Sequence, residues 1–220
     1  MRIFDNIEEL ENEMCSTITA LLTEAINTNG LARILLSGGS TPKGLYSKLS
    51  HTKIEWEKVE IGLVDERFVD TNSAFSNERM IRQTLVINKA KDATFIGMVA
   101  DPSDYQVNLN IANNRYKTFI ASDVLILGMG LDGHTASIFP NDPYSSMAIE
   151  EPIAAIKNTH APSAPIKRIT LNKAFINTCK HVLLIFSGAE KEKVYNYSIQ
   201  EKYPISNFKE KIEMAYFAKN

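Results

Sequence analysis

The 220-residue chain has few cysteines, no excess of either charge and no long hydrophobic run. Only Cys15 and Cys179 occur, which excludes a disulfide framework and favours a reducing compartment. Lys and Arg number 24 against 26 Asp and Glu, so the net charge of −2 offers no broad basic surface for nucleic acid. No apolar run approaches the ~20 residues of a membrane span, and the start of the chain turns acidic at once, unlike a signal peptide. We therefore expect a soluble cytoplasmic protein that binds neither nucleic acid nor membrane.

What the sequence does contain is an alternation of short apolar runs with segments of helical period. Its 44% hydrophobic and 23% charged residues are typical of a folded globular protein. A first helix is predicted over 6–29, with Asp5 or Asn6 as its cap and Gly30 at its end. Strands are predicted at 32–36, 59–64, 94–98, 123–128 and 181–186, and further helices at 42–50, 76–87, 103–121 and 189–201. Apolar strands alternating with helices indicate an α/β fold with a mostly parallel sheet and helices on both faces.

Residues 140–166 interrupt this rhythm. Five prolines in the segment argue against a long helix, and only 153–156 has the pattern of a strand. We expect this part to pass over the edge of the sheet and to lead into strands at 168–171 and 214–218. No linker divides the chain, so residues 1–220 are predicted to form a single domain.

The first turn with possible chemistry follows the strand at 32–36. It contains Gly38, Gly39, Ser40 and Thr41, then Pro42 at the predicted first position of a helix with Thr41 as its cap. Two glycines and a helix N-terminus can direct backbone N–H groups at an anion such as phosphate. The spacing is not that of a P-loop, and a tight turn without a ligand explains the same residues equally well.

The second such turn contains Asp65, Glu66 and Arg67 directly after a buried strand. Carboxylates there can bind sugar hydroxyls and an arginine can bind an anion, although a solvated loop is the commoner environment of such a triplet. Ser76 or Asn77 is predicted to cap the next helix. Arg79 in that helix could reach the same turn or lie on the surface.

The third turn places Gly128, Gly130 and Gly133 in a G-x-G-x-x-G spacing after a strand. This spacing weakly matches a dinucleotide-binding motif, but prolines cut short the helix that such a motif requires. Alternatively, the glycines bring His134 to the end of the sheet beside Asp132. A histidine there can act as a general base, and a carboxylate can orient its ring. No third ligand with recognisable spacing supports a metal site.

Two later cations complete the candidates. Arg168 opens the strand at 168–171, and Lys191 lies in the first turn of the helix predicted at 189–201. A cation opposes the helix dipole at that position unless an anion lies between them, so Lys191 indicates a bound phosphate or is simply exposed.

Taken together, the motifs SGGSTPKGLY (37–46), VDERFV (64–69), SNERM (76–80), LGMGLDGHTASIFP (127–140), KRITLN (167–172) and SGAEK (187–191) resemble those of the 6-phosphogluconolactonases. The resemblance implies hydrolysis of 6-phospho-D-glucono-1,5-lactone in the oxidative pentose phosphate pathway, without metal or organic cofactor. It also implies a Rossmann-like parallel sheet with a small extra β-containing portion.

The same resemblance assigns a role to each candidate residue. It implies that Gly38, Gly39, Ser40 and Thr41 hold the substrate phosphate together with Arg168 and Lys191. It implies that His134 activates water, that Asp132 orients it, and that Asp65, Glu66 and Arg67 line the sugar pocket.

Two other functions remain open at this point. A glucosamine-6-phosphate deaminase or phosphosugar isomerase would share the phosphate loop, and a sugar-phosphate sensor would share the fold without catalysis. In either case we expect a small phosphosugar as the ligand, and a monomer or weak homodimer as the state of the chain.

Overall fold

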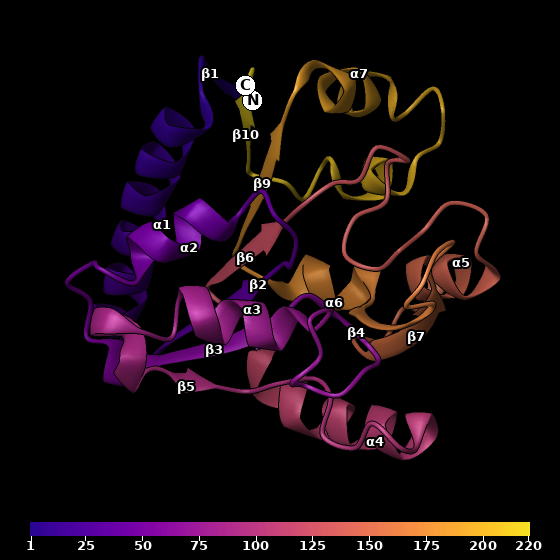
Figure 1. Cartoon of the computed structure of the whole chain (residues 1–220), viewed down its shortest axis with the longest axis horizontal. Helices are drawn as coiled ribbons and strands as arrows, with labels where there is room; N and C mark the ends of the chain where they lie inside the picture. The colour runs from indigo at the N-terminus through magenta and orange to yellow at the C-terminus, as the bar shows by residue number, and fades with distance from the viewer.

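The computed structural model describes residues 1–220, and its largest element is a seven-stranded sheet in which every neighbouring pair is parallel (Figure 1). In spatial order its strands are β1 (Arg2–Phe4), β10 (Met214–Ala218), β9 (His181–Ser187), β6 (Val124–Leu127), β2 (Ala32–Leu36), β3 (Val59–Leu63) and β5 (Thr94–Phe95). The predicted α/β fold with a mostly parallel sheet is confirmed.

Helices flank this sheet, with α1 and α2 on the left in Figure 1 and α7 at the upper right. The α-helices are α1 (Ile7–Asn29), α2 (Lys43–Leu49), α3 (Asn77–Thr84), α4 (Tyr105–Tyr116), α5 (Pro143–Glu150), α6 (Lys173–Thr178) and α7 (Ala189–Tyr197). Short 3₁₀ helices are η1 (Trp56–Lys58), η2 (Asn88–Asp92), η3 (Lys117–Phe119) and η4 (Pro204–Phe208). None of the helices combines the length and the hydropathy that crossing a membrane requires.

The first helix forms as its sequence predicts. The Asn6 side chain accepts a hydrogen bond from the N–H of Glu9 at 2.9 Å, and Gly30 ends the helix in the left-handed conformation with φ of 74°. Its buried face includes Leu10, Met14 and Ile18 and packs against β2, β6 and β10. Burial of this stripe fixes α1 on one face of the sheet.

A second, three-stranded antiparallel sheet consists of β4 (Asp65–Arg67), β8 (Lys167–Leu171) and β7 (Ile156–His160) in that order. The chain passes from one sheet to the other at Val64. The N–H of Val64 donates to the Leu36 carbonyl at 2.9 Å, and its carbonyl accepts from the N–H of Leu171 at 2.9 Å. The small sheet therefore begins where β3 ends, at the carboxyl edge of the large sheet.

The direction of strand order reverses at β2. The chain adds β3 and β5 on one side of β2, and then returns to place β6 on its other side. Open α/β sheets bind ligands in the crevice outside the carboxyl ends of the strands at such a reversal. The loops that follow β2 and β6 therefore meet where a ligand is expected.

Several elements differ from their predicted extent or were not predicted. The strand predicted at 153–156 instead runs from Ile156 to His160, and the one predicted at 94–98 ends at Phe95. The helices predicted at 76–87, 103–121 and 189–201 are shorter at their ends, at 77–84, 105–116 and 189–197. The strands β1 and β4 and the helices α5 and α6 were missed.

The start of α2 corrects a more specific prediction. The helix begins at Lys43, Pro42 occupies the N-cap position, and no side chain caps it, so Thr41 is not the cap. The N–H of Lys43 instead donates to the Ser40 carbonyl at 3.3 Å, which closes a turn before the helix and leaves the Thr41 side chain outside it.

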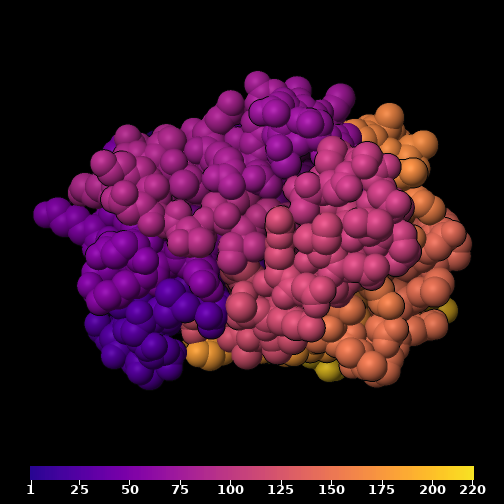
Figure 2. Space-filling view, turned by 90° about the horizontal axis from the view of Figure 1, so that it is seen from below, coloured from indigo at the N-terminus to yellow at the C-terminus, as the bar shows by residue number.

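One cluster of 51 buried hydrophobic residues includes members of both sheets and of α1, α2 and α4. Figure 2 shows the molecule from below the view of Figure 1. Residues from the middle of the chain, coloured magenta to pink, form much of this face. Tyr116 at the end of α4 joins this region to the sheet. Its fully buried hydroxyl accepts from the N–H of Leu63 at 2.8 Å and donates to the Ile96 carbonyl at 3.0 Å.

We expect Tyr116→Phe to lower the free energy of unfolding by about 1–3 kcal/mol, because it leaves a buried N–H and a carbonyl without their partner. Urea unfolding followed by circular dichroism measures this change. Tyr197→Phe is the matched control, since Tyr197 is 59% exposed. Equal stability of the two variants would contradict the structural role of the Tyr116 hydroxyl.

Candidate active site

The loop after β2 approaches its neighbours so closely that it needs glycine. A Cβ on Gly38 would lie 1.9 Å from Oδ1 of Asn77, and Gly39 has φ of 98°, which side chains disfavour. Beside them the hydroxyl of Ser37 is buried and has no hydrogen-bond partner. A buried unpaired donor next to a glycine turn is a feature of a site that binds a ligand.

The loop after β6 carries the predicted histidine. Gly133 has φ of 74°, a Cβ on it would lie 2.4 Å from Cβ of Tyr203, and its carbonyl accepts from the N–H of Ile205 at 3.0 Å. The next α-helix begins only at Pro143. The structure therefore contradicts the dinucleotide-binding alternative, which requires a helix directly after the third glycine.

His134 and Asp132 form a pair in this loop. Nδ1 of His134 lies 2.5 Å from Oδ1 of Asp132, and the side chains are 34% and 38% exposed. A Cβ on Gly130 would lie 2.2 Å from the same Nδ1, so this glycine makes room for the ring. Burial opposes ionisation of Asp132, but the hydrogen bond and charge of His134 hold the pKa of this carboxyl below its ordinary value. With Nδ1 bonded to a carboxylate, Nε2 is the nitrogen left for other partners.

Ser137, three residues further on, fixes the loop to the small sheet. Its hydroxyl donates to Oδ2 of Asp65 in β4 at 2.6 Å. Its N–H donates to the Thr170 hydroxyl in β8 at 3.2 Å, and its carbonyl accepts from the Thr159 hydroxyl in β7 at 2.5 Å. Ser137, Thr159 and Thr170 are fully buried. One residue therefore joins the histidine loop to all three strands.

The strand β4 explains which members of the charged triplet reach the cavity. Successive side chains of a strand point to opposite faces, so Asp65 and Arg67 share one face and Glu66 has the other. Arg67 lies directly opposite Arg168 in the register of β4 and β8. Its Nη1 donates to the Phe75 carbonyl at 2.5 Å, whereas its buried Nε has no partner. Two facing cations are unfavourable without an anion nearby.

Glu66 is not in the wall of the cavity, which corrects the prediction that it lines the sugar pocket. It is 1% exposed, and its carboxylate accepts from the N–H groups of Arg67 at 2.6 Å, Asn77 at 2.8 Å and Glu78 at 2.8 Å. Burial raises its pKa to about 7, against the opposing effect of these donors. Glu66 thus secures the start of α3, because the strand turns it away from the cavity.

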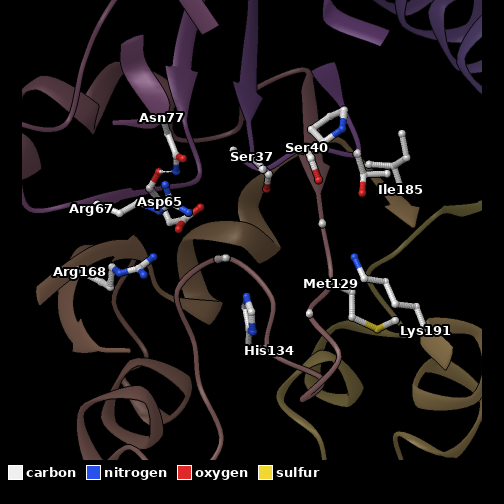
Figure 3. A pocket seen from close by; sticks show the side chains of 17 residues that line it. Ser37, Ser40, Asp65, Arg67, Asn77, Met129, His134, Arg168, Ile185 and Lys191 are labelled. Carbon is white, nitrogen blue, oxygen red and sulfur yellow. Dashed lines mark hydrogen bonds between the residues drawn. The ribbon is translucent and has the colours of Figure 1, made fainter. Parts of the chain in front are cut away.

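Arg168 and Lys191 approach the cavity from different elements. Burial is the main cause that lowers the pKa of each, and neither forms an ion pair with a carboxylate. Nε of Arg168 donates to the Pro165 carbonyl at 2.8 Å. Figure 3 shows the charged ends of the two side chains on opposite sides of the cavity, with His134 between them. The arrangement is that of a site for an anion.

These parts surround one cavity of about 230 Å³ lined by 17 residues, of which three are hydrophobic. Among the predicted site residues, those in its wall are Gly38, Gly39, Ser40, Thr41, Asp65, Arg67, His134, Arg168 and Lys191. Asp132 is not in the wall and contacts the site through Nδ1 of His134. Arg79 is directed elsewhere and donates to the Asn72 carbonyl at 2.6 Å.

Eight lining residues were not predicted as site residues: Ser37, Pro42, Asn77, Gly128, Met129, Gly130, Ala136 and Ile185. Most of these lie in motifs that the sequence analysis singled out, the glycine turns and the SNERM helix start, but without a binding role of their own. Ile185 belongs to the buried strand β9 and Met129 follows the buried strand β6, where nothing in the sequence distinguishes them from core.

Comparison with known proteins agrees with the family resemblance of the sequence motifs. Residues 5–216 match the family model described as glucosamine-6-phosphate isomerases/6-phosphogluconolactonase. A 6-phosphogluconolactonase of Neisseria meningitidis serogroup A is 34% identical over 209 residues, with 92% of this chain and 90% of the relative covered. One from Helicobacter pylori strain 26695 is 32% identical over 205 residues, with 92% and 88% covered.

Solved structures agree with the architecture. The crystal structure of a 6-phosphogluconolactonase from Shewanella baltica has a TM-score of 0.93 and 33% identity, covering 100% of this chain and 97% of that one. The structure of 6-phosphogluconolactonase from Thermotoga maritima has a TM-score of 0.86 at 24% identity, covering 100% and 98%, and shows the shared fold.

Proposed function

Because the chain belongs to the glucosamine-6-phosphate isomerase/6-phosphogluconolactonase family, we propose that it hydrolyses 6-phospho-D-glucono-1,5-lactone to 6-phospho-D-gluconate in the oxidative pentose phosphate pathway. One observation supports this most strongly: His134, which is bonded to Asp132, lines the same cavity as Arg67, Arg168 and Lys191, three cations that form no ion pair with a carboxylate. A phosphosugar lactone has an electrophilic carbonyl at one end, which suits His134, and a phosphate dianion at the other, which suits the cations.

In the proposed mechanism, His134 is the general base. Its Nε2 takes a proton from water as the water oxygen attacks the lactone carbonyl carbon. The ring C–O bond then breaks, and the imidazolium returns the proton to the leaving ring oxygen. Asp132, bonded to Nδ1, orients the ring and stabilises the imidazolium. Water adds across the ester bond, so no co-reactant is consumed.

The carbonyl oxygen becomes an oxyanion during the attack and needs donors. The N–H of Gly130 is occupied by the His134 carbonyl at 2.9 Å, and that of Gly133 by the Gly130 carbonyl at 3.1 Å. Arg67 lines the same cavity, on the face of β4 that it shares with Asp65, and its guanidinium is a charged donor. We therefore assign the oxyanion to Arg67, and the sugar hydroxyls to Asp65, which bonds Ser137 through Oδ2.

The phosphate is assigned to the Gly38–Thr41 loop between Arg168 and Lys191. The unpaired hydroxyl of Ser37 adds a donor there. Burial of Lys191 is not offset by any carboxylate, and for Arg168 burial outweighs the attraction of Asp65 and Glu66, so a phosphate dianion would stabilise both cations. Holding this remote group provides binding energy that orients the carbonyl toward His134.

A coupled assay tests the activity itself. Glucose-6-phosphate dehydrogenase generates the lactone, and we expect the protein to speed its disappearance above the spontaneous rate. No acceleration would refute the proposal. Release of ammonia from glucosamine 6-phosphate, in place of lactone hydrolysis, would favour the deaminase activity that the family also contains.

We expect His134→Ala to lower kcat by roughly 10²–10⁴-fold, because the general base is lost. Binding of inorganic phosphate, measured by calorimetry, should stay within about twofold, since the phosphate loop is on another element. His51→Ala is the matched control, as His51 is exposed and outside the cavity. A fully active His134→Ala enzyme would remove this residue from the mechanism.

We expect Lys191→Ala and Arg168→Ala to raise KM by about tenfold or more, because each removes a charged hydrogen-bond donor. Burial lowers the pKa of Lys191, so its charge is lost at a lower alkaline pH than that of an exposed lysine. KM should therefore rise with pH in the alkaline range, and less so in Lys191→Arg, which stays protonated.

Lys193→Ala, an exposed lysine of the same helix, is the control for this series. Unchanged KM in both the Lys191 and Arg168 variants would show that the phosphate binds elsewhere.

A further inference from the structure

The side chain of Asn77 touches two parts of the site at once. It is 3% exposed, and its Nδ2 donates to the Asp65 carbonyl in β4 at 3.0 Å. Its Oδ1 lies against Gly38, where a Cβ would approach to 1.9 Å. One amide therefore spans the gap between the loop after β2 and the strand that carries Arg67.

The position of Asn77 is itself fixed by β4. Its N–H donates to Oε1 of Glu66 at 2.8 Å, and Oε2 of the same carboxylate accepts from the N–H of Glu78 at 2.8 Å and the Ser76 hydroxyl at 3.0 Å. The buried carboxylate of Glu66 thus holds the whole first turn of α3 against β4. Asn77 has little freedom to move with the loop.

We propose that Asn77 is a positioning residue that sets the distance between the Gly38–Thr41 loop and the strands β4 and β8 that carry Arg67 and Arg168. Figure 3 shows Asn77 beside Asp65, across the cavity from Lys191. The inference rests on the proposed function in one respect, namely that a phosphate lies between this loop and Arg168.

This role explains why position 38 is glycine. Its backbone does not require a positive φ, so the constraint is the space that the Asn77 amide occupies. The absence of a side chain at Gly38 leaves the space that the side chain of Asn77 fills. A methyl group at position 38 would push the loop away from β4, and removing the amide at position 77 would leave it unsupported.

The first test is Asn77→Ala. We expect KM for the lactone and the dissociation constant of inorganic phosphate each to rise by about tenfold, the effect of one lost buried hydrogen bond and its contact. The value of kcat should fall by a smaller factor than KM rises, because Asn77 does not touch His134 or Asp132 and affects Arg67 only through β4. Asn108→Ala is the matched control, a fully buried asparagine that bonds the Met98 carbonyl outside the cavity.

The second test distinguishes positioning from direct contact with the ligand. Gly38→Ala alone should weaken phosphate binding more than Asn77→Ala does while leaving it measurable, and adding Asn77→Ala should restore part of it, because the clash is relieved. Asn77→Ala would then weaken binding in the native background and strengthen it in the Gly38→Ala background. If Asn77 instead binds phosphate directly, the double variant binds more weakly than Gly38→Ala, which overturns the proposal.

Thermal unfolding of the native protein, the two single variants and the double variant tests the contact between Asn77 and Gly38 separately from the proposed lactonase activity. The packing of Asn77 on Gly38 predicts that the double variant loses less stability than the sum of the single variants, whether or not the protein is a lactonase. Additive losses would overturn the positioning role. Failure of the native protein to bind phosphate would refute the assigned phosphate site and, with it, this role toward the ligand. If Asn77→Ala does not fold, Asn77→Ser replaces it, since serine suits a helix start but does not reach β4.

Discussion

The site depends on the hydrogen bonds of Ser137, which fix the loop after β6 to the small sheet. His134 is on this loop of the large sheet, whereas Asp65, Arg67 and Arg168 are on the small one. Each of the three small strands contributes one partner to Ser137. Because these groups are buried, a change in the angle between the sheets would leave polar atoms unpaired at a cost of about 1–3 kcal/mol each. The geometry of the cavity is therefore secured by a residue that does not line it.

The charges of the cavity show a balance between stability and binding. Arg67 faces Arg168 across two strands, and the pKa values of Arg168 and Lys191 are lowered by burial. The fold tolerates this unfavourable charge, and Oγ of Ser37 and Nε of Arg67 are buried without a hydrogen-bond partner. Sites arranged for ligands commonly sacrifice stability in this way. The carboxylate of Glu66 has a different structural role, since it accepts the N–H groups at the start of α3.

Much of this arrangement could be predicted from the sequence, since glycine turns and charged groups after buried strands must meet at one edge of a parallel sheet. Gly38, Gly39, His134 and Lys191 follow from that rule. The orientation of Glu66 could not be predicted, because three charged residues give no sign that they pair as a strand. The five prolines of residues 140–166 exclude a long helix but did not reveal the short helix α5, although proline is well suited to the first helical position, where Pro143 starts it. The single-domain organisation stays a prediction.

The pairing of β1 with β10 links the two ends of the chain in one sheet (Figure 1). The neighbours of β10 are β9 and β1, so Arg2–Phe4 has no strand to join until Met214–Ala218 is in place. The segment Arg2–Phe4 is therefore among the last to be incorporated into the sheet, although it precedes every other strand in the sequence. Tyr216 of β10 also pairs with Ile185 of β9, which lines the cavity, so the closure of the sheet by its two terminal strands lies one strand away from the cavity wall.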